Sequence, residues 1–277
     1  MKAFLVPVAR HDRMNAVLET ALLAARRFDG VVEGFALTPA LAEYVPVDMV
    51  GGLTWVGDAE ADEAAAKQAR DDFAAFMQAR GVPRRGGPPG LSFEWLRQAA
   101  PGDAFLGHYA RLFGATVVGR PGPGEGQPRM TTLEAALFES GRPILIAPPD
   151  APGTLGEVVV IAWNGSSETA RTLALGMPFL RKARRVVVVE VEGASVPGPD
   201  AAAVSASLAR EGIPSESRTA QAGRRSTGET FLAEAVALGC DLLVKGAYTQ
   251  SRLRQMIFGG ATNHTLGAAT MPVLMAH

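Results

Sequence analysis

The chain has 277 residues, of which 47% are hydrophobic, and a formal net charge of −1. These values predict a globular protein of one large or two ordinary domains, and the balanced charge argues against a nucleic-acid partner. The one cysteine excludes an internal disulfide, and no apolar run reaches the ~20 residues of a membrane span. We therefore expect a cytoplasmic protein with no membrane partner.

The first half of the chain alternates short apolar runs with segments of helical spacing. Gly30 is the expected stop of the first helix, and Asp58 and Gly81 are the expected N-cap and stop of the second. The predicted elements are a strand at 5–8, a helix at 14–28, a strand at 31–37, a helix between Asp58 and Gly81, a strand at 92–97, a helix at 103–113, a strand at 116–118, a helix at 133–138 and a strand at 144–147.

The second half of the chain repeats this order. The predicted elements are a strand at 158–162, a helix from 167, a strand at 185–191, a helix at 201–210, a strand at 215–218, a helix at 230–238, a strand at 241–244, a helix from about 261 and a strand at 273–275. Strands that alternate with helices, and that are mostly continuous apolar runs, are typical of a parallel sheet covered on both faces.

The two halves are also alike in their local sequences. FLVPVARHD near residue 4 is echoed by VVIAWNGSS near residue 159, and Pro143 and Pro272 each precede a short apolar strand near the end of a half. Prolines and glycines punctuate residues 148–156 between the halves. We predict an α/β fold of two doubly wound domains, residues 1–149 and 155–277, each with a mostly parallel five-stranded sheet and helices on both faces.

The loops after the first and fourth strands of each half are the expected binding sites. In an open α/β sheet, ligands bind beyond the carboxyl ends of the strands where the strand order reverses. In the second half, Gly246 follows the fourth strand and Gly259-Gly260 opens the last helix, whose free N–H groups attract anions. These glycines could cradle a phosphate, or Gly246 could make only a tight turn and the glycine pair only begin a helix.

The spacing of these glycines resembles that of the universal stress protein family. Nucleotide-binding members carry a Gly, two residues, a second Gly, nine residues, and then Gly followed by Ser or Thr. In KGAYTQSRLRQMIFGGATNHTL, residues 245–266, this spacing falls on Gly246, Thr249, Gly259 and Gly260. Thr249 replaces the second Gly and Gly260 replaces the hydroxyl residue, while Thr262 supplies a hydroxyl near the same helix end. Arg252 and Arg254 in the spacer either balance phosphate charge or lie in water.

The resemblance implies a tandem universal stress protein that binds ATP with Mg²⁺ in its second half. Asn164 lies at the position where the family has an Asp that meets the adenosine, and Ala162 lies at a position where the family often has Pro. Val191 ends the second strand, where backbone flanks the adenine. The family also implies that the fifth strands pair across the domain interface, so that the halves pack about a pseudo-two-fold axis.

The first half departs further from the family's pattern. Ala9 stands at the position that matches Asn164, and Gly119 is followed by RPGPGEGQPRM, whose prolines lack the N–H donors that a phosphate needs. Glu125 in this segment would also repel a phosphate. We expect no nucleotide in the first half.

No catalytic motif accompanies these features. The sequence has no phosphate loop ending in Gly-Lys-Ser/Thr, no Gly-x-Ser-x-Gly and no His-Glu-x-x-His, its histidines are scattered, and Cys240 is expected to be a small buried residue. We expect a stress-response regulator that is not an enzyme. The alternative is a module that binds an unknown protein partner or another small ligand without nucleotide, and slow ATP hydrolysis stays open but would need a carboxylate or a metal.

Overall fold

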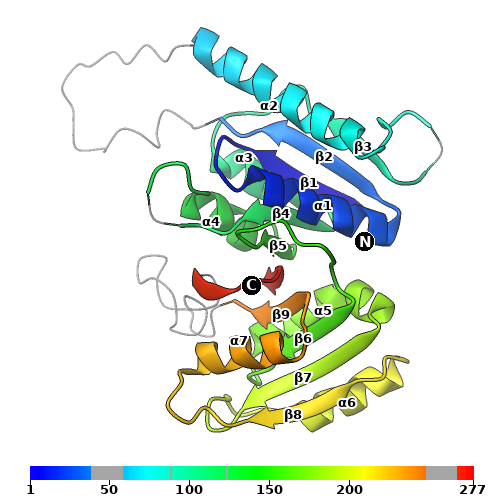
Figure 1. Ribbon diagram of the computed structural model, residues 1–277, viewed down its shortest axis with the longest axis vertical. Coiled ribbons are helices and arrows are strands. Elements are labelled where there is room, and N and C mark those ends of the chain that lie inside the picture. The colour runs from blue at the N-terminus through cyan, green and yellow to red at the C-terminus, as the bar shows by residue number, and fades with distance from the viewer. Residues whose placement is uncertain (39–58, 88, 123, 248–266) are drawn as a thin grey trace.

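The computed structural model describes residues 1–38, 59–87, 89–122, 124–247 and 267–277, which form a central sheet between two layers of helices (Figure 1). The strands are β1 (Ala3–Val8), β2 (Val31–Ala36), β3 (Ser92–Trp95), β4 (Ala115–Gly119), β5 (Ile144–Ala147), β6 (Val158–Ala162), β7 (Arg185–Val191), β8 (Glu216–Ala220), β9 (Leu242–Gly246) and β10 (Val273–Ala276). Hydrogen bonds join them in one ten-stranded sheet in the order β3-β2-β1-β4-β5-β10-β9-β6-β7-β8. The predicted α/β fold class is confirmed.

The centre of the sheet is the junction between the two halves. Each half contributes five parallel strands, and β5 pairs antiparallel with β10, with Leu145 opposite Leu274. The strand order of the first half is therefore mirrored in the second, as a two-fold axis through the middle of the sheet produces. The expected pairing of the fifth strands is present, and it leaves neither apolar strand as an open edge.

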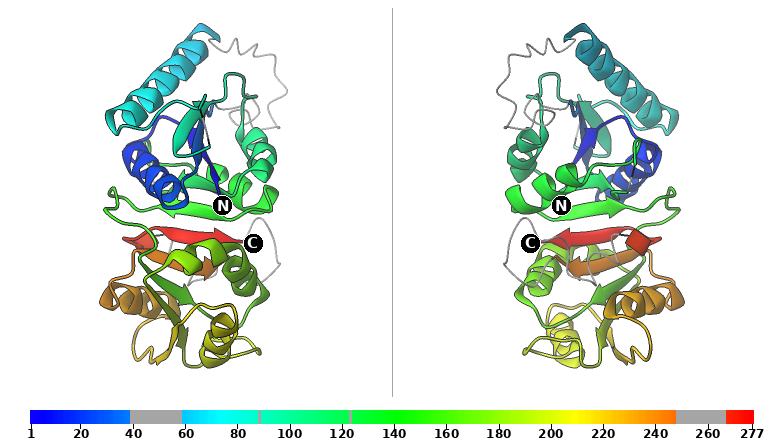
Figure 2. Two further views of the ribbon diagram at one scale, coloured as in Figure 1. Left: turned by 90° about the vertical axis from the view of Figure 1, so that its right-hand side faces the viewer. Right: turned by 90° about the vertical axis from the view of Figure 1, so that its left-hand side faces the viewer.

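The helices lie in two layers, one on each side of the sheet (Figure 2). One face carries α1 (Met14–Phe28), α2 (Ala59–Ala79), α5 (Ser167–Lys182) and α6 (Ala201–Arg210), and the other carries α3 (Asp103–Tyr109), the 3-10 turn Ala110–Leu112, α4 (Met130–Glu139) and α7 (Thr227–Ala237). The apolar core on each face includes residues of both halves. On the first face, the ring of Phe28 meets that of Phe179 edge-on, 4.9 Å between centroids.

Several helix ends differ from the prediction: α4 spans Met130–Glu139 instead of 133–138, and α3 ends at Tyr109 before a 3-10 turn. The ends of α1 and α7 differ for identifiable reasons. The left-handed residue that ends α1 is Asp29, at φ 49°, whereas a Cβ on Gly30 would lie 2.4 Å from the carbonyl oxygen of Lys2. Gly30 is therefore needed because β1 passes close to it, and not because it stops the helix. Helix α7 begins three residues earlier than its apolar spacing suggests, since Ser226 and Glu229 form a capping box. The predicted N-cap Asp58 lies outside the described residues.

Arg27 connects the two halves at the end of α1. Its guanidinium donates to Glu157 Oε1 and to the Gly156 carbonyl oxygen, each at 2.7 Å, and also to the carbonyl oxygen of Lys182. In return, the ammonium group of Lys182 donates to the carbonyl oxygen of Arg27 at 2.7 Å. The Arg27 side chain is only 10% exposed, so its bonds to Glu157 and Gly156 are partly shielded from water, whereas those with Lys182 lie at the surface.

Replacement of Arg27 by alanine is expected to destabilise the protein by about 2 kcal/mol, because it removes the ion pair with Glu157 and the hydrogen bonds to two carbonyl oxygens of the second half. Arg26→Ala is the matched control, since Arg26 is exposed and bonds to the Arg80 carbonyl oxygen within the first half. Urea denaturation measures both free energies of unfolding. Equal losses for the two variants would contradict a role of Arg27 at the junction.

Candidate functional site

The carboxyl ends of β6, β7 and β9 bring four predicted site residues to one edge of the sheet. Ala162 and Gly246 are the last residues of the neighbouring strands β6 and β9, Val191 ends β7, and Asn164 follows β6 by two residues. Ala162 and Val191 are buried, and Asn164 is half-buried. The strand order reverses between β6 and β9, which is where ligands bind in open α/β sheets.

Four further predicted residues lie outside the described part of the chain. These are Thr249, Gly259, Gly260 and Thr262, together with Arg252 and Arg254 of the spacer. Their proposed contacts with phosphate stay predictions.

Asn164 uses its side-chain oxygen inside its own loop. Its Oδ1 accepts hydrogen bonds from Thr169 Oγ1 at 2.6 Å and from the Ser166 backbone N–H at 3.2 Å. Ser166 is the N-cap of α5 and accepts in turn from the N–H of Thr169. Asn164 therefore helps to order the first turn of α5, and its amide NH₂ is the part of the side chain that a ligand can use as a donor.

Gly246 is required by contact with α5. A Cβ at this position would lie 2.5 Å from the Thr169 backbone nitrogen, 2.6 Å from Thr169 Oγ1 and 2.8 Å from the Glu168 carbonyl carbon. Its φ is not in the left-handed region, so a tight turn does not explain it. The glycine lets the end of β9 approach the start of α5, and this contact accounts for the residue without a phosphate.

The loop after β7 packs on the loop after β6. Trp163 donates its indole N–H to the carbonyl oxygen of Pro199 at 2.7 Å, and Val196 donates its N–H to the carbonyl oxygen of Asn164 at 2.9 Å. Gly165 has φ 78°, and a Cβ there would lie 2.7 Å from the Val196 carbonyl oxygen. Trp163 belongs to the loop after the first strand of the second half, which the sequence indicates as a binding loop, and a Trp directly after a buried strand needs an acceptor for its N–H.

Sequence reasoning gave no role to Lys245. It is the penultimate residue of β9 and only 7% exposed, and its ammonium group donates to the carbonyl oxygen of Gly246 at 3.1 Å. Burial lowers the pKa of Lys245 to about 8. The signal in the sequence is a single cation at the end of the apolar run Leu242–Val244.

The corresponding edge of the first half is covered by its own chain. A Cβ on Gly119 would lie 2.5 Å from Pro128 Cγ, so the segment after β4 folds back over the strand end. Asp12 donates its N–H to the Gly126 carbonyl oxygen, and Arg13 Nε donates to Gln127 Oε1, each at 2.9 Å. The segment after β4 therefore occupies the space just beyond the end of this strand, and the absence of nucleotide from the first half stays a prediction.

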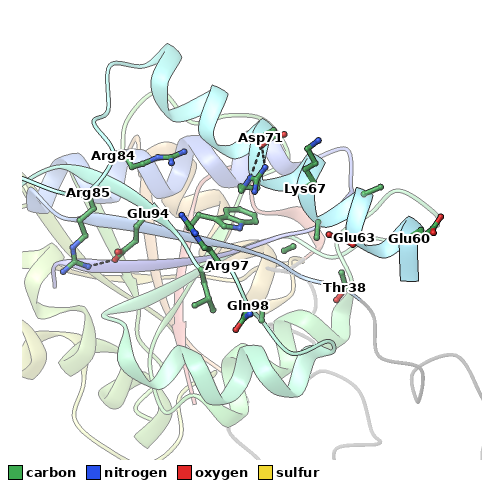
Figure 3. A pocket seen from close by; sticks show the side chains of 17 residues that line it. Thr38, Glu60, Glu63, Lys67, Asp71, Arg84, Arg85, Glu94, Arg97 and Gln98 are labelled. Carbon is green, nitrogen blue, oxygen red and sulfur yellow. Dashed lines mark hydrogen bonds and ion pairs between the residues drawn. The ribbon is translucent and has the colours of Figure 1, made fainter. Parts of the chain in front are cut away.

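A separate cleft of about 1310 Å³ lies at the opposite end of the sheet, between α2 and β3 (Figure 3). Its lining is mostly charged, and an ion pair joins Arg85 to Glu94 across part of it. Seven strand positions separate β3 from β6 in the sheet order, so this cleft is distinct from the predicted site.

Among the described residues, no group of three or more His, Cys, Asp and Glu side chains is arranged to hold a metal ion. Burial raises the pKa of Cys240 to about 12, so its thiol stays protonated near neutral pH.

Of the helices in the part of the chain that the structure describes, none is both long and apolar enough to cross a membrane.

Solved structures of known proteins share the architecture of this chain. No family model matches the chain, and neither does any curated protein. Among solved structures, a universal stress protein from Archaeoglobus fulgidus DSM 4304 superposes with a TM-score of 0.71 over 99% of this chain and 97% of its own, at 15% identity. The chain has the fold of a tandem universal stress protein.

Two solved structures from Pseudomonas aeruginosa agree with this fold assignment. A putative universal stress protein from strain UCBPP-PA14 matches 100% of this chain and 93% of its own at 13% identity, with a TM-score of 0.57. A functionally unknown protein from strain PAO1 matches 100% and 92% at 12% identity, also with a TM-score of 0.57. In this fold, the carboxyl ends of β6, β7 and β9 in the second half carry the predicted site residues Ala162, Asn164, Val191 and Gly246.

Proposed function

We propose that this protein is a non-catalytic stress-response regulator of the cytoplasm that binds ATP with Mg²⁺ in its second half. The observation that supports this most directly is the convergence of Ala162, Asn164, Val191 and Gly246 at the point where strand order reverses. The Asn164 amide would donate to the adenosine, and the backbone at Val191 would flank the base. Domains 1–149 and 155–277 would act as a nucleotide-free half and a nucleotide-binding half.

The proposal assigns no catalytic residue. Hydrolysis of ATP needs a group that orients the attacking water, and none of the four described site positions carries a carboxylate. The nucleotide would therefore act as a signal whose binding changes the protein's interactions with partner proteins.

The alternative function is a stress-linked module that binds a protein or another small ligand and no nucleotide. Two observations favour it: the Asn164 oxygen is engaged within its own loop, and contact with α5 accounts for Gly246. Both residues have structural reasons to be present that do not involve ATP.

Calorimetric titration of the nucleotide-stripped protein with ATP and Mg²⁺ tests the proposal. We expect saturable binding of one ATP per chain. Asn164→Asp keeps an acceptor for Thr169 and Ser166 but places a carboxylate at the adenosine, and a charge-assisted bond should tighten binding by about tenfold.

Ala9→Asp is the matched control, because Ala9 is the equivalent position of the first half and should leave ATP binding unchanged. Absence of binding up to about 1 mM ATP would reject the nucleotide proposal in favour of the alternative module.

A further inference from the structure

Two glutamates of the first half lie next to each other on the sheet face that α3 covers. Glu33 of β2 and Glu94 of β3 are register partners in neighbouring parallel strands, so their side chains point to the same face. Tyr109 of α3 donates its hydroxyl to Glu33 Oε1 at 2.5 Å. Glu33 is only 9% exposed. A buried carboxyl group therefore has a second carboxyl group as its neighbour in the sheet.

The groups that act on Glu33 come from each element around it. Tyr109 approaches from α3 and Glu94 from β3, while the register neighbour on β1 is the apolar Leu5. Arg85, in the segment beside β3, forms an ion pair with Glu94 (Figure 3). Burial raises the pKa of Glu33 most; the Tyr109 hydrogen bond lowers it, the neighbouring Glu94 raises it and the Arg85 charge lowers it. The net direction is upward, so Glu33 keeps its proton at pH values where an ordinary glutamate has lost it.

We propose that the Glu33–Glu94 pair holds a single proton that acts as a pH-sensitive clasp on the outer edge of the first half. With the proton present, a neutral carboxyl group lies beside Glu94. Its release to solvent leaves two carboxylates side by side, and like charges on facing positions of neighbouring strands destabilise their pairing. The inference is independent of nucleotide binding, because β2 and β3 lie at the opposite end of the sheet from β6 and β9.

β3 is the element that the clasp holds. It has only four residues and is the last strand at its end of the sheet. Hydrogen bonds to β2 and its preceding residue flank Glu94 on either side. The Ser92 N–H donates to the Gly30 carbonyl oxygen at 3.1 Å, and the Leu96 N–H donates to the Gly34 carbonyl oxygen at 2.9 Å. Few bonds hold so short an edge strand, so repulsion at its centre should open it locally before the rest of the fold.

The sign of the pH dependence follows from the direction of the pKa change. The pKa of Glu33 is raised on folding above its ordinary value of 4.5, so the folded protein binds the extra proton. The contribution of the clasp is full below pH 4.5 and is lost as the pH rises through the folded pKa. A carboxylate stabilised by a salt bridge would give the opposite trend.

Ionisation of Glu33 can be followed by NMR of protein labelled with ¹³C at the glutamate Cδ. The Glu33→Gln spectrum identifies the Glu33 signal, and Glu63, which is exposed on α2, is the reference, identified through Glu63→Gln. We expect Glu33 to titrate at a higher pH than Glu63. Glu94→Gln should move the Glu33 midpoint downward, because it removes a neighbouring negative charge. If Glu33 titrates together with Glu63, the inference is overturned.

Amide hydrogen exchange tests whether the proton holds β3 in place. The protection of the Ser92 and Leu96 N–H groups, corrected for the intrinsic exchange rate, is measured at about pH 5 and at about pH 8. We expect this protection to fall with rising pH in the wild-type protein. It should not fall in Glu33→Gln, whose side chain stays uncharged and keeps an acceptor oxygen for Tyr109.

A matched control exists in the second half. The Glu192 N–H donates to the Ala220 carbonyl oxygen at 3.0 Å, between β7 and β8, the strand pair that mirrors β2 and β3. Its protection should not follow that of β3. Glu94→Gln, at a less buried position, should also remove the pH dependence and serves where Glu33→Gln folds poorly. Protection of β3 that is constant with pH in the wild-type protein, or that falls equally in both variants, would overturn the inference.

Discussion

Gly246→Ala is expected to destabilise the protein by about 3 kcal/mol or more, because the added methyl group would meet backbone. The nearest atom is the Thr169 nitrogen at 2.5 Å, in the first turn of α5. Backbone cannot rotate aside as a flexible side chain can, so relief requires that α5 move away from β9, and overpacking of this kind is among the costly changes in a core. Urea denaturation followed by circular dichroism measures the loss.

Gly153→Ala is the matched control. Gly153 has no atom within 4 Å of an added Cβ and no left-handed φ, so its substitution should change stability by less than about 0.5 kcal/mol. Similar losses for the two variants would mean that Gly246 has more room than its contacts with α5 indicate.

The expected instability of Gly246 variants limits what a binding experiment with them can show. A variant at Gly246 that fails to bind ATP would have lost the geometry of α5 and with it the Asn164 loop. Loss of binding there would not identify a phosphate contact. The isosteric Asn164→Asp change is more informative because its oxygen can still accept from Thr169.

Lys245→Met is expected to stabilise the protein by about 3 kcal/mol at pH 7, because it removes the cost of burying a cation. The pKa of Lys245 falls from 10.5 to about 8 on folding, and each unit corresponds to about 1.4 kcal/mol. Burial of Lys245 is nearly complete, so solvent screening reduces this cost little.

The pH dependence gives this prediction a second readout. Below pH 8 the lysine is protonated in both states, and the folded protein bears the full cost of burial. Between pH 8 and 10.5 the unfolded chain binds the extra proton, so the wild-type protein gains stability as the pH rises. The advantage of Lys245→Met should therefore shrink steadily from pH 8 to pH 10.

Urea denaturation at pH 7 and at pH 10 tests this dependence. Lys67→Met is the control, because Lys67 is exposed. We expect it to change the free energy of unfolding by less than about 0.5 kcal/mol at both pH values. A difference between wild type and Lys245→Met that stays constant with pH would show that Lys245 keeps an ordinary pKa.

Hydrophobic spacing was sufficient to predict much of the fold. Five predicted elements have the same bounds as in the structure: α1 (Met14–Phe28), β5 (Ile144–Ala147), β6 (Val158–Ala162), β7 (Arg185–Val191) and α6 (Ala201–Arg210). Most residues of these elements lie against one of the two apolar cores, so their periodicity reflects their burial. The edge strand β8 was placed at 215–218 and lies at Glu216–Ala220, because four of its five residues are exposed and carry no apolar alternation.

The sequence was sufficient to locate the candidate site, but not to predict which contacts its residues make. Spacing and strand ends identified Asn164 and Gly246, whose place at the strand-reversal point follows from topology. What a Cβ on Gly246 would meet depends on α5, which begins about eighty residues earlier in the chain. The direction of Lys245 likewise depends on which face Gly246 turns toward α5, and local sequence does not contain that information.

The antiparallel pair at the centre of the sheet has a consequence during protein synthesis. β5 ends at Ala147, whereas its partner β10 begins at Val273. At the usual pace of translation, the ribosome needs roughly 10 s to produce the intervening residues. During that time β5, whose four residues ILIA are all buried in the complete sheet, is an open edge of the first half. Newly made chains on neighbouring ribosomes could pair through this edge until β10 has been synthesised and covers it.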